Sequence, residues 1–163
     1  MNQAHFHLVL NHIPIILPGV GLLVMLAGYM LNSEIVKRTA YSIFILGAII
    51  TIPALLTGEG AEEVVEKVQG IDKQFIKNHE HVADTFAILC YILGGISLAG
   101  LWASWKQKPI SKLIGLVTIV FCMVVLIFAK QTGTTGGEIR HTEIRTTTTY
   151  TSFTTPNPES GRY

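Results

Sequence analysis

The chain is poor in charged residues. Only 14% of its 163 residues are Asp, Glu, Lys or Arg, against about 25% in a typical soluble domain. The 12 basic and 11 acidic side chains leave a formal net charge of +1, which excludes nucleic-acid binding through bulk positive charge and a disordered polyelectrolyte. Two cysteines exclude a disulfide framework. Hydrophobic residues make up 49% of the chain and the mean hydropathy is +0.46, so the composition indicates a small integral membrane protein.

Four stretches of sequence are apolar and long enough to cross a bilayer, whose hydrocarbon core of about 30 Å needs about 20 helical residues. They are residues 13–31, 41–57, 82–105 and 110–129. We therefore predict an all-α membrane protein, a four-transmembrane-helix bundle over residues 1–145. Residues 58–81 combine valines with a row of glutamates, which predicts an amphipathic loop between helices 2 and 3 that lies on the mouth of the bundle. The Thr-rich residues 146–163 predict an extended C-terminal tail.

Basic residues gather at one end of the predicted bundle. The short connections between spans 1 and 2 and between spans 3 and 4 carry them against a lone Glu34, and Trp102 and Trp105 belong to the same end. These basic residues are Lys37, Arg38, Lys106, Lys108 and Lys112. The positive-inside rule therefore predicts that this end faces the cytoplasm and that both termini lie outside.

Small residues inside the spans predict how the helices pack. Gly95, Ala99 and Ala103 recur every four residues in the third span, a spacing that predicts close approach of a neighbouring helix. Cys90 and Cys122 lie in the middle of the third and fourth spans. We expect both to be buried, unreactive thiols that pack as small apolar groups.

Histidine is the most informative residue type. All six histidines fall near span boundaries at the end opposite the basic connections: His5, His7, His12, His79, His81 and His141. Histidine is the commonest metal ligand and a usual axial ligand of haem, and facing helices at the mouth of a bundle are a standard place for such a site. The distribution therefore predicts a cofactor or metal site at this end.

Local sequence features predict the positions of His12 and His141. Pro14 predicts a break in the backbone before the first span, with Asn11 or His12 as the helix cap. The two glycines at 136–137 predict that the chain after the fourth span folds back over the mouth of the bundle. Such a fold brings His141 to the other histidines.

Four short blocks resemble the signature blocks of a bacterial family of four-helix integral membrane proteins of unknown function. They are residues 7–14 (HLVLNHIP), 57–59 (TGE), 79–80 (HE) and 136–141 (GGEIRH). Some members of that family are fused to c-type cytochrome or Rieske iron–sulfur domains. The resemblance therefore implies a redox role with b-type haem in the bacterial inner membrane, and its matching histidines are His7, His12, His79 and His141.

Three functions fit these observations. The first is a membrane b-type cytochrome-like subunit that passes electrons between the quinone pool and a redox partner subunit at the outer, periplasmic face. One or two haem b groups are then held by imidazole pairs from the four matched histidines. We expect His12 with His79 to be the axial pair, because both stand at span entrances.

The second function is a non-haem metal-binding membrane protein. Glu59 and Glu63 share a helix face and could join His12, His79 and His141 in a mixed carboxylate–imidazole site for iron, zinc or manganese. The third is a structural subunit of a larger membrane complex that holds no cofactor. The sequence leaves open whether the protein is an enzyme. It gives little support to hydrolase chemistry, because no serine or cysteine at the mouth of the bundle is placed to act as a nucleophile. Apart from the lipid bilayer, the expected partners are membrane or redox subunits and quinone, with no nucleic acid.

Overall fold

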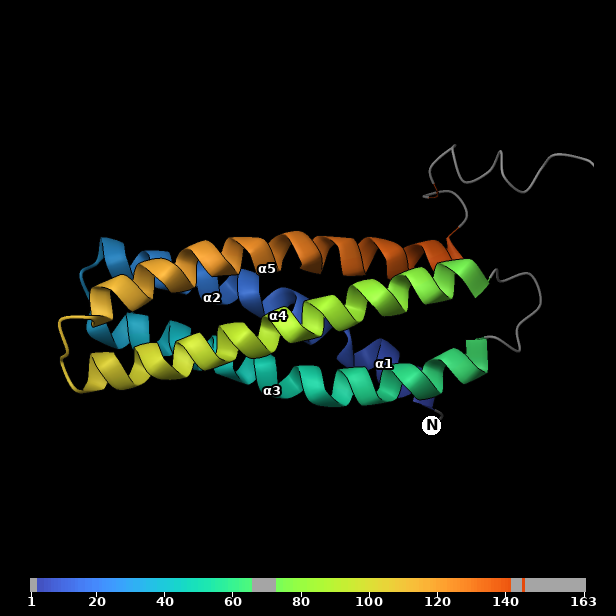
Figure 1. Cartoon of the computed structure of the whole chain (residues 1–163), viewed down its shortest axis with the longest axis horizontal. Helices are drawn as coiled ribbons and strands as arrows, with labels where there is room; N and C mark the ends of the chain where they lie inside the picture. Colours follow the sequence, from blue (N-terminus) through green and yellow to red (C-terminus); the bar gives the residue numbers. More distant parts are fainter. Residues whose placement is uncertain (1–2, 66–72, 142–144, 146–163) are drawn as a thin grey trace, which may run out of the picture.

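The computed structural model describes residues 3–65, 73–141 and 145, and this part of the chain is built from helices. In chain order they are α1 (Gln3–Leu10), α2 (His12–Met30), α3 (Glu34–Val65), α4 (Lys73–Trp105) and α5 (Ser111–Arg140). The four long helices lie side by side in an elongated bundle, and the short α1 lies beside α3 at the end where α3 and α5 finish (Figure 1). The predicted all-helical, four-helix bundle is confirmed.

Four of the helices are long and apolar enough to cross a membrane, so the chain is a multi-pass membrane protein. Three of them exceed the predicted spans, with 32 residues in α3, 33 in α4 and 30 in α5. At 1.5 Å per residue these helices are about 45–50 Å long, whereas a hydrocarbon core is about 30 Å thick. Each therefore extends beyond the core by about 15 Å or more.

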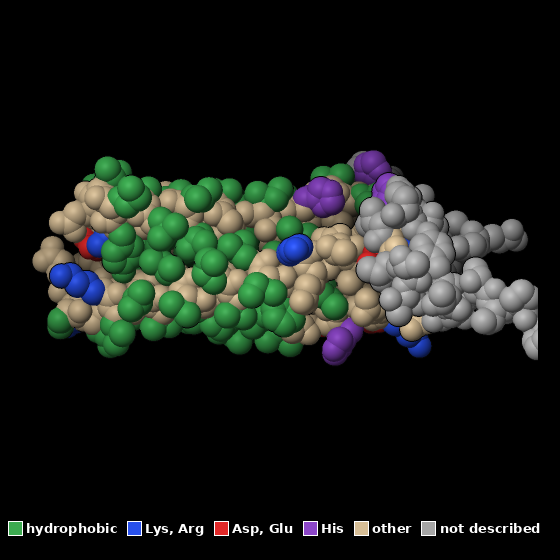
Figure 2. Space-filling model, turned by 90° about the horizontal axis from the view of Figure 1, so that it is seen from above, with side chains coloured by type: hydrophobic (Ala, Val, Ile, Leu, Met, Phe, Trp, Pro, Cys, Tyr) green, Lys and Arg blue, Asp and Glu red, His purple; other side chains and the backbone are tan. Residues whose placement is uncertain are grey.

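The surplus length lies at the end that carries the histidines. On α5 the exposed hydrophobic side chains reach as far as Ile127, and exposed Lys130 then opens a polar final stretch. Asp84 on α4 and Glu59 on α3 are exposed acidic residues beyond the apolar stretches of those helices. Hydrophobic side chains accordingly cover most of the length of the bundle, and histidines gather toward one end (Figure 2). At the other end, charged residues lie at the helix ends themselves. Glu34, for example, is the first residue of α3.

The segment between the second and third spans differs from the predicted amphipathic loop. Residues 58–65 continue α3 and residues 73–81 begin α4, so the described part of the segment prolongs the bundle and does not form a cap across its mouth. Phe75 and Ile76 in the first turn of α4 are buried, and this tertiary packing stabilises helix that polar sequence alone would not. Residues 66–72 and 146–163, and with them the predicted tail, lie outside the described residues.

A break at Asn11 separates α1 from α2, as Pro14 predicts. Asn11 nevertheless keeps helical torsion angles, with φ −62° and ψ −26°, and its side chain makes no capping hydrogen bond. The prediction of a break is therefore confirmed, and the prediction that Asn11 caps the span through its side chain is wrong.

The close contact between α3 and α4 is made by different small residues than predicted. A Cβ atom added to Gly94 would stand 2.6 Å from the Cβ atom of Ala48, whereas one added to Gly95 would meet nothing within 4 Å. Gly95 and Ala99 are exposed, and only Ala103 of the predicted stripe is buried. One helical residue corresponds to a rotation of about 100°, so a shift of one position moves the stripe from the packed face to the exposed face.

Large side chains from α2 to α5 fill the core of the bundle. The most deeply buried include Met25, Tyr41, Phe44, Leu93 and Val125. Both cysteines are buried free thiols, as predicted, and Cys122 Sγ lies 3.4 Å from the Pro18 carbonyl oxygen, to which it donates a weak hydrogen bond.

Candidate functional site

The histidines come from four different helices and meet at one end of the bundle. His5 and His7 lie on α1, His12 begins α2, His79 and His81 lie near the start of α4, and His141 ends α5. This is the end where α3, α4 and α5 project beyond the bilayer core, and the space-filling view shows histidine side chains near it (Figure 2). Their gathering at one end is as predicted.

His7 is half-buried between α1 and α3. Its Nδ1 atom lies 3.0 Å from the Ala54 carbonyl oxygen and 3.4 Å from Thr57 Oγ1. A carbonyl oxygen can only accept, so Nδ1 carries the proton and donates it. This bond fixes the tautomer of His7 and leaves Nε2 with a lone pair that can coordinate a metal.

His79 is half-buried between α4 and α5 and is held in the same manner. Its Nδ1 atom lies 3.0 Å from Thr135 Oγ1. The same Thr135 hydroxyl lies 3.0 Å from the Gln131 carbonyl oxygen; a hydroxyl can both donate and accept, so it serves either tautomer of His79. Both imidazoles are thus held through Nδ1. With its proton on Nδ1, His79 also offers Nε2 as a potential ligand.

A positive charge on His7 disfavours one on His79, and a positive charge on His12 disfavours one on His7. The expected pairing of His12 with His79 stays a prediction. His12 is exposed in the first turn of α2, whereas His7 and His79 are both half-buried. His7 and His79 are therefore the half-buried histidines whose rings are held against a second helix, His7 against α3 and His79 against α5.

Glycines give the two rings room. A Cβ atom added to Gly58 would stand 3.4 Å from His7 Cε1, and one added to Gly136 would stand 3.0 Å from His79 Cε1. The predicted role of the two glycines at 136–137 is wrong, because α5 continues through them to Arg140 and does not fold back. Gly136 instead permits close approach of the His79 ring.

The remaining predicted ligands are not assembled with this pair. His12 and His141 are exposed, as are Glu59 and Glu63. The two glutamates do share a face of α3, as predicted, because that helix runs to Val65. Within residues 3–65 and 73–141, no group of three or more His, Cys, Asp or Glu side chains is placed to hold one metal ion.

Two polar groups at this end were not found by sequence reasoning. Asn11 Oδ1 is buried and has no hydrogen-bond partner among the described residues, so it is an acceptor that a ligand or water could satisfy. Arg145 donates to the carbonyl oxygens of Glu138 and Ile139 at 2.8 and 3.2 Å, and its guanidinium lies 4.1 Å from the ring centre of Phe75. Sequence reasoning considered Asn11 as a helix cap and did not foresee that its oxygen is buried and, within the described residues, unpartnered.

The fold and the site together define a class: a multi-pass, four-helix membrane protein with an anchored histidine pair at one projecting end. Comparison with protein-family models, with curated proteins and with solved structures finds no match for this chain. The family resemblance drawn from the four sequence blocks therefore stays a prediction. In the structure, blocks 7–14 and 57–59 meet at His7, and blocks 79–80 and 136–141 meet at His79.

Proposed function

We propose that this protein is a membrane-bound, b-type cytochrome-like subunit in which His7 and His79 are the axial ligands of a haem at the outer face. The observation that carries the proposal is the matched anchoring of the two imidazoles. Each ring is held at Nδ1, 3.0 Å from Ala54 O and 3.0 Å from Thr135 Oγ1 respectively, so Nε2 is the nitrogen that would ligate the iron. Metal-ligating histidines usually have their second nitrogen held in this way.

The number of donors favours haem over a non-haem metal. A porphyrin supplies four nitrogen ligands, so two imidazoles complete the coordination of its iron. A protein site for zinc or non-haem iron usually needs at least three side-chain ligands. The described residues provide no group of three, which leaves the pair His7 and His79 better suited to axial ligation than to a mixed His/Glu site.

The residues around the pair fit this role. Gly58 and Gly136 leave space for the two rings. Phe75 lies one turn before His79 on the same face of α4 and is buried, so it gives the imidazole an apolar neighbour that excludes water. Arg145 stacks on Phe75 and uses part of its guanidinium on helix carbonyls, and its other N–H groups are suited to a carboxylate such as a haem propionate.

Haem supplies reversible one-electron transfer when it is bound, and the protein tunes its potential through ligands, hydrogen bonds and burial. In this proposal the chain holds the haem where α3, α4 and α5 project from the bilayer. Electrons then pass between quinone in the membrane and a redox partner subunit in the periplasm of a bacterium. The proposal places the protein in the inner membrane, with the basic end in the cytoplasm.

A reduced-minus-oxidised absorption spectrum tests the proposal. We expect protein purified in detergent from haem-replete cells to show a Soret band and a sharp α-band, and pyridine haemochrome analysis to identify haem b. His7→Ala and His79→Ala should each lose these bands. His81→Ala is the matched control, because His81 is exposed only two residues from His79 and should keep the spectrum.

Two further results distinguish the alternatives. In His79→Gly protein, added imidazole should restore the bands if the variant is folded and lacks only the ligand. A colourless preparation with stoichiometric iron, zinc or manganese would support the non-haem metal-binding function instead. A colourless, metal-free preparation that copurifies with a fixed partner would support the structural subunit. Either colourless result overturns the cytochrome proposal.

A further inference from the structure

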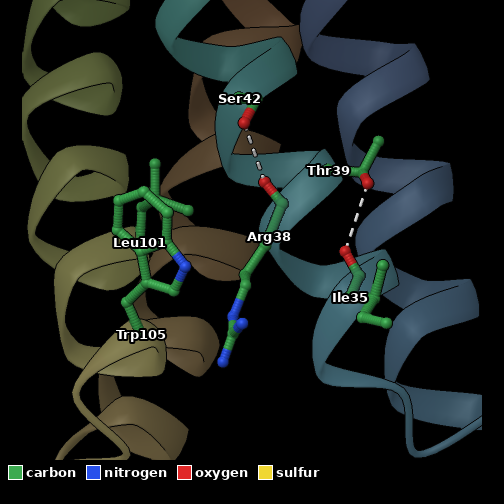
Figure 3. Close-up of a pocket in the computed structure, with 6 residues that line it drawn as sticks. All are labelled: Ile35, Arg38, Thr39, Ser42, Leu101 and Trp105. Carbon is green, nitrogen blue, oxygen red and sulfur yellow. Dashed lines mark hydrogen bonds between the residues drawn. The ribbon is translucent and has the colours of Figure 1, made fainter.

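An open groove lies between α3 and α4 at the end of the bundle opposite the histidines. Its volume is about 300 Å³. It is lined by Ile35, Arg38, Thr39 and Ser42 from α3 and by Leu101 and Trp105 from α4 (Figure 3). Nothing in the proposed electron-transfer site uses these residues.

Arg38 is the only charged side chain that lines this groove, and it is held in place. Its Nε donates to Ser104 Oγ at 2.9 Å and its Nη2 donates to the Ser104 carbonyl oxygen at 2.9 Å. A guanidinium has five N–H donors, so these two bonds leave others for a ligand. In the close-up the side chain runs along the groove between Trp105 and the start of α3 (Figure 3).

The groove lies in a basic region. Glu34 forms an ion pair with Lys37 and accepts a hydrogen bond from Ser104 Oγ at 2.7 Å. The charges of Glu34, Lys37 and Arg38 therefore sum to +1. Further positive charges at this end come from Lys106, Lys108 and Lys112. The electrostatics favour an anion in the groove.

The groove also has a depth that suits a lipid. From Ile35 to Ser42 the α3 helix rises by about 10 Å. The polar layer on each side of a bilayer core is about 5–8 Å thick, so the groove is long enough to cross this layer and reach the hydrocarbon. Trp105 is 70% exposed, which is typical of a tryptophan at the membrane–water interface. Leu101 supplies an apolar wall farther in.

We propose that this groove binds one anionic phospholipid, with its phosphate on Arg38 and an acyl chain along Leu101. Arginine suits a phosphate because its N–H groups can bind two oxygens at once. A basic pocket between transmembrane helices at the cytoplasmic side is a typical site for an anionic headgroup. A zwitterionic lipid binds less well, because its positive headgroup is repelled by the lysines at this end.

Quenching of tryptophan fluorescence by lipids with brominated acyl chains tests this inference. The chain has two tryptophans, so Trp102→Phe leaves Trp105, which lines the groove, as the only reporter. We expect brominated phosphatidylglycerol in mixed micelles to reach half-maximal quenching at a mole fraction about tenfold lower than brominated phosphatidylcholine. Equal quenching curves for the two lipids overturn the proposal.

Variants in the same background show whether the groove is responsible. Arg38→Gln should abolish the preference for phosphatidylglycerol, whereas Lys108→Gln, which removes a basic residue outside the groove, should retain it. Because Arg38 also links α3 to α4, Ser42→Phe provides an independent test: Ser42 is exposed, and the larger side chain should block the groove and weaken quenching. A preference that survives both Arg38→Gln and Ser42→Phe contradicts the assignment. If millimolar inorganic phosphate relieves the quenching, the site binds a soluble anion and the lipid assignment is wrong.

Discussion

Two adjacent glycines in α4 provide a sharp test of the helix packing. Gly94 is buried against α3, where an added Cβ would stand 2.6 Å from the Ala48 Cβ, and Gly95 is exposed with nothing within 4 Å of an added Cβ. Gly94→Ala and Gly95→Ala make the same chemical change at neighbouring positions of one helix. The difference between the two variants therefore reports only on which face packs.

The magnitude follows from the overlap. Optimal separation between two carbon atoms is about 3.5–4.0 Å, so α3 and α4 must separate by about 1 Å to accept alanine at 94. Overpacking of this kind costs about 1–3 kcal/mol, whereas glycine to alanine in a helix gains about 0.8–1 kcal/mol at either position. The gain cancels in the comparison. We expect Gly94→Ala to have an unfolding free energy about 1–3 kcal/mol lower than Gly95→Ala.

SDS-induced unfolding in mixed micelles measures this difference, and thermal unfolding should separate the melting temperatures by about 2–12 °C. The double variant Gly94→Ala with Ala48→Gly removes the overlapping atom and should recover most of the loss, as in a double-mutant cycle. If Gly95→Ala proves as destabilising as Gly94→Ala, the rotation of α4 in the bundle is wrong. The predicted stripe through Gly95 would then be the packed one.

Two further predictions concern thiols. Cys90 and Cys122 are 3% and 0% exposed, so neither should react with a maleimide in folded protein and both should react after denaturation in SDS; fast labelling of native protein would contradict their burial. With both cysteines replaced by alanine, a membrane-impermeant maleimide added to intact cells should label Thr134→Cys on the projecting end of α5 but not Lys108→Cys. The reverse pattern would show that the histidine end faces the cytoplasm.

Much of the architecture is local information and was therefore predictable. A bilayer demands long apolar helices that satisfy their own backbone hydrogen bonds, so each span is visible in the sequence as one hydrophobic run. Cys90 and Cys122 were expected to be buried and are, whereas the adjacent Tyr91 and Met123 are exposed. The topology that puts the six histidines at one end follows from the number of spans alone. The break at Asn11 was signalled by Pro14.

The lengths of the helices were not predictable from apolar runs. The projecting part of α4 begins with Lys73 and carries polar side chains, and its helix is stabilised because Phe75 and Ile76 are buried against the bundle. That burial depends on neighbouring helices. Sequence reasoning therefore treated residues 58–81 as a loop, because it could see the polar character of the segment but not its packing.

What the sequence alone determined was composition along the chain: where membrane can be crossed, which end is basic and which end holds the histidines. Only the tertiary structure decided which faces meet, because a rotation of about 100° per residue separates Gly94 from Gly95 and packing between helices sets that rotation. The same arrangement places Ala54 against His7 and Thr135 against His79. These hydrogen bonds join residues far apart in the chain, and they form only once the helices are placed.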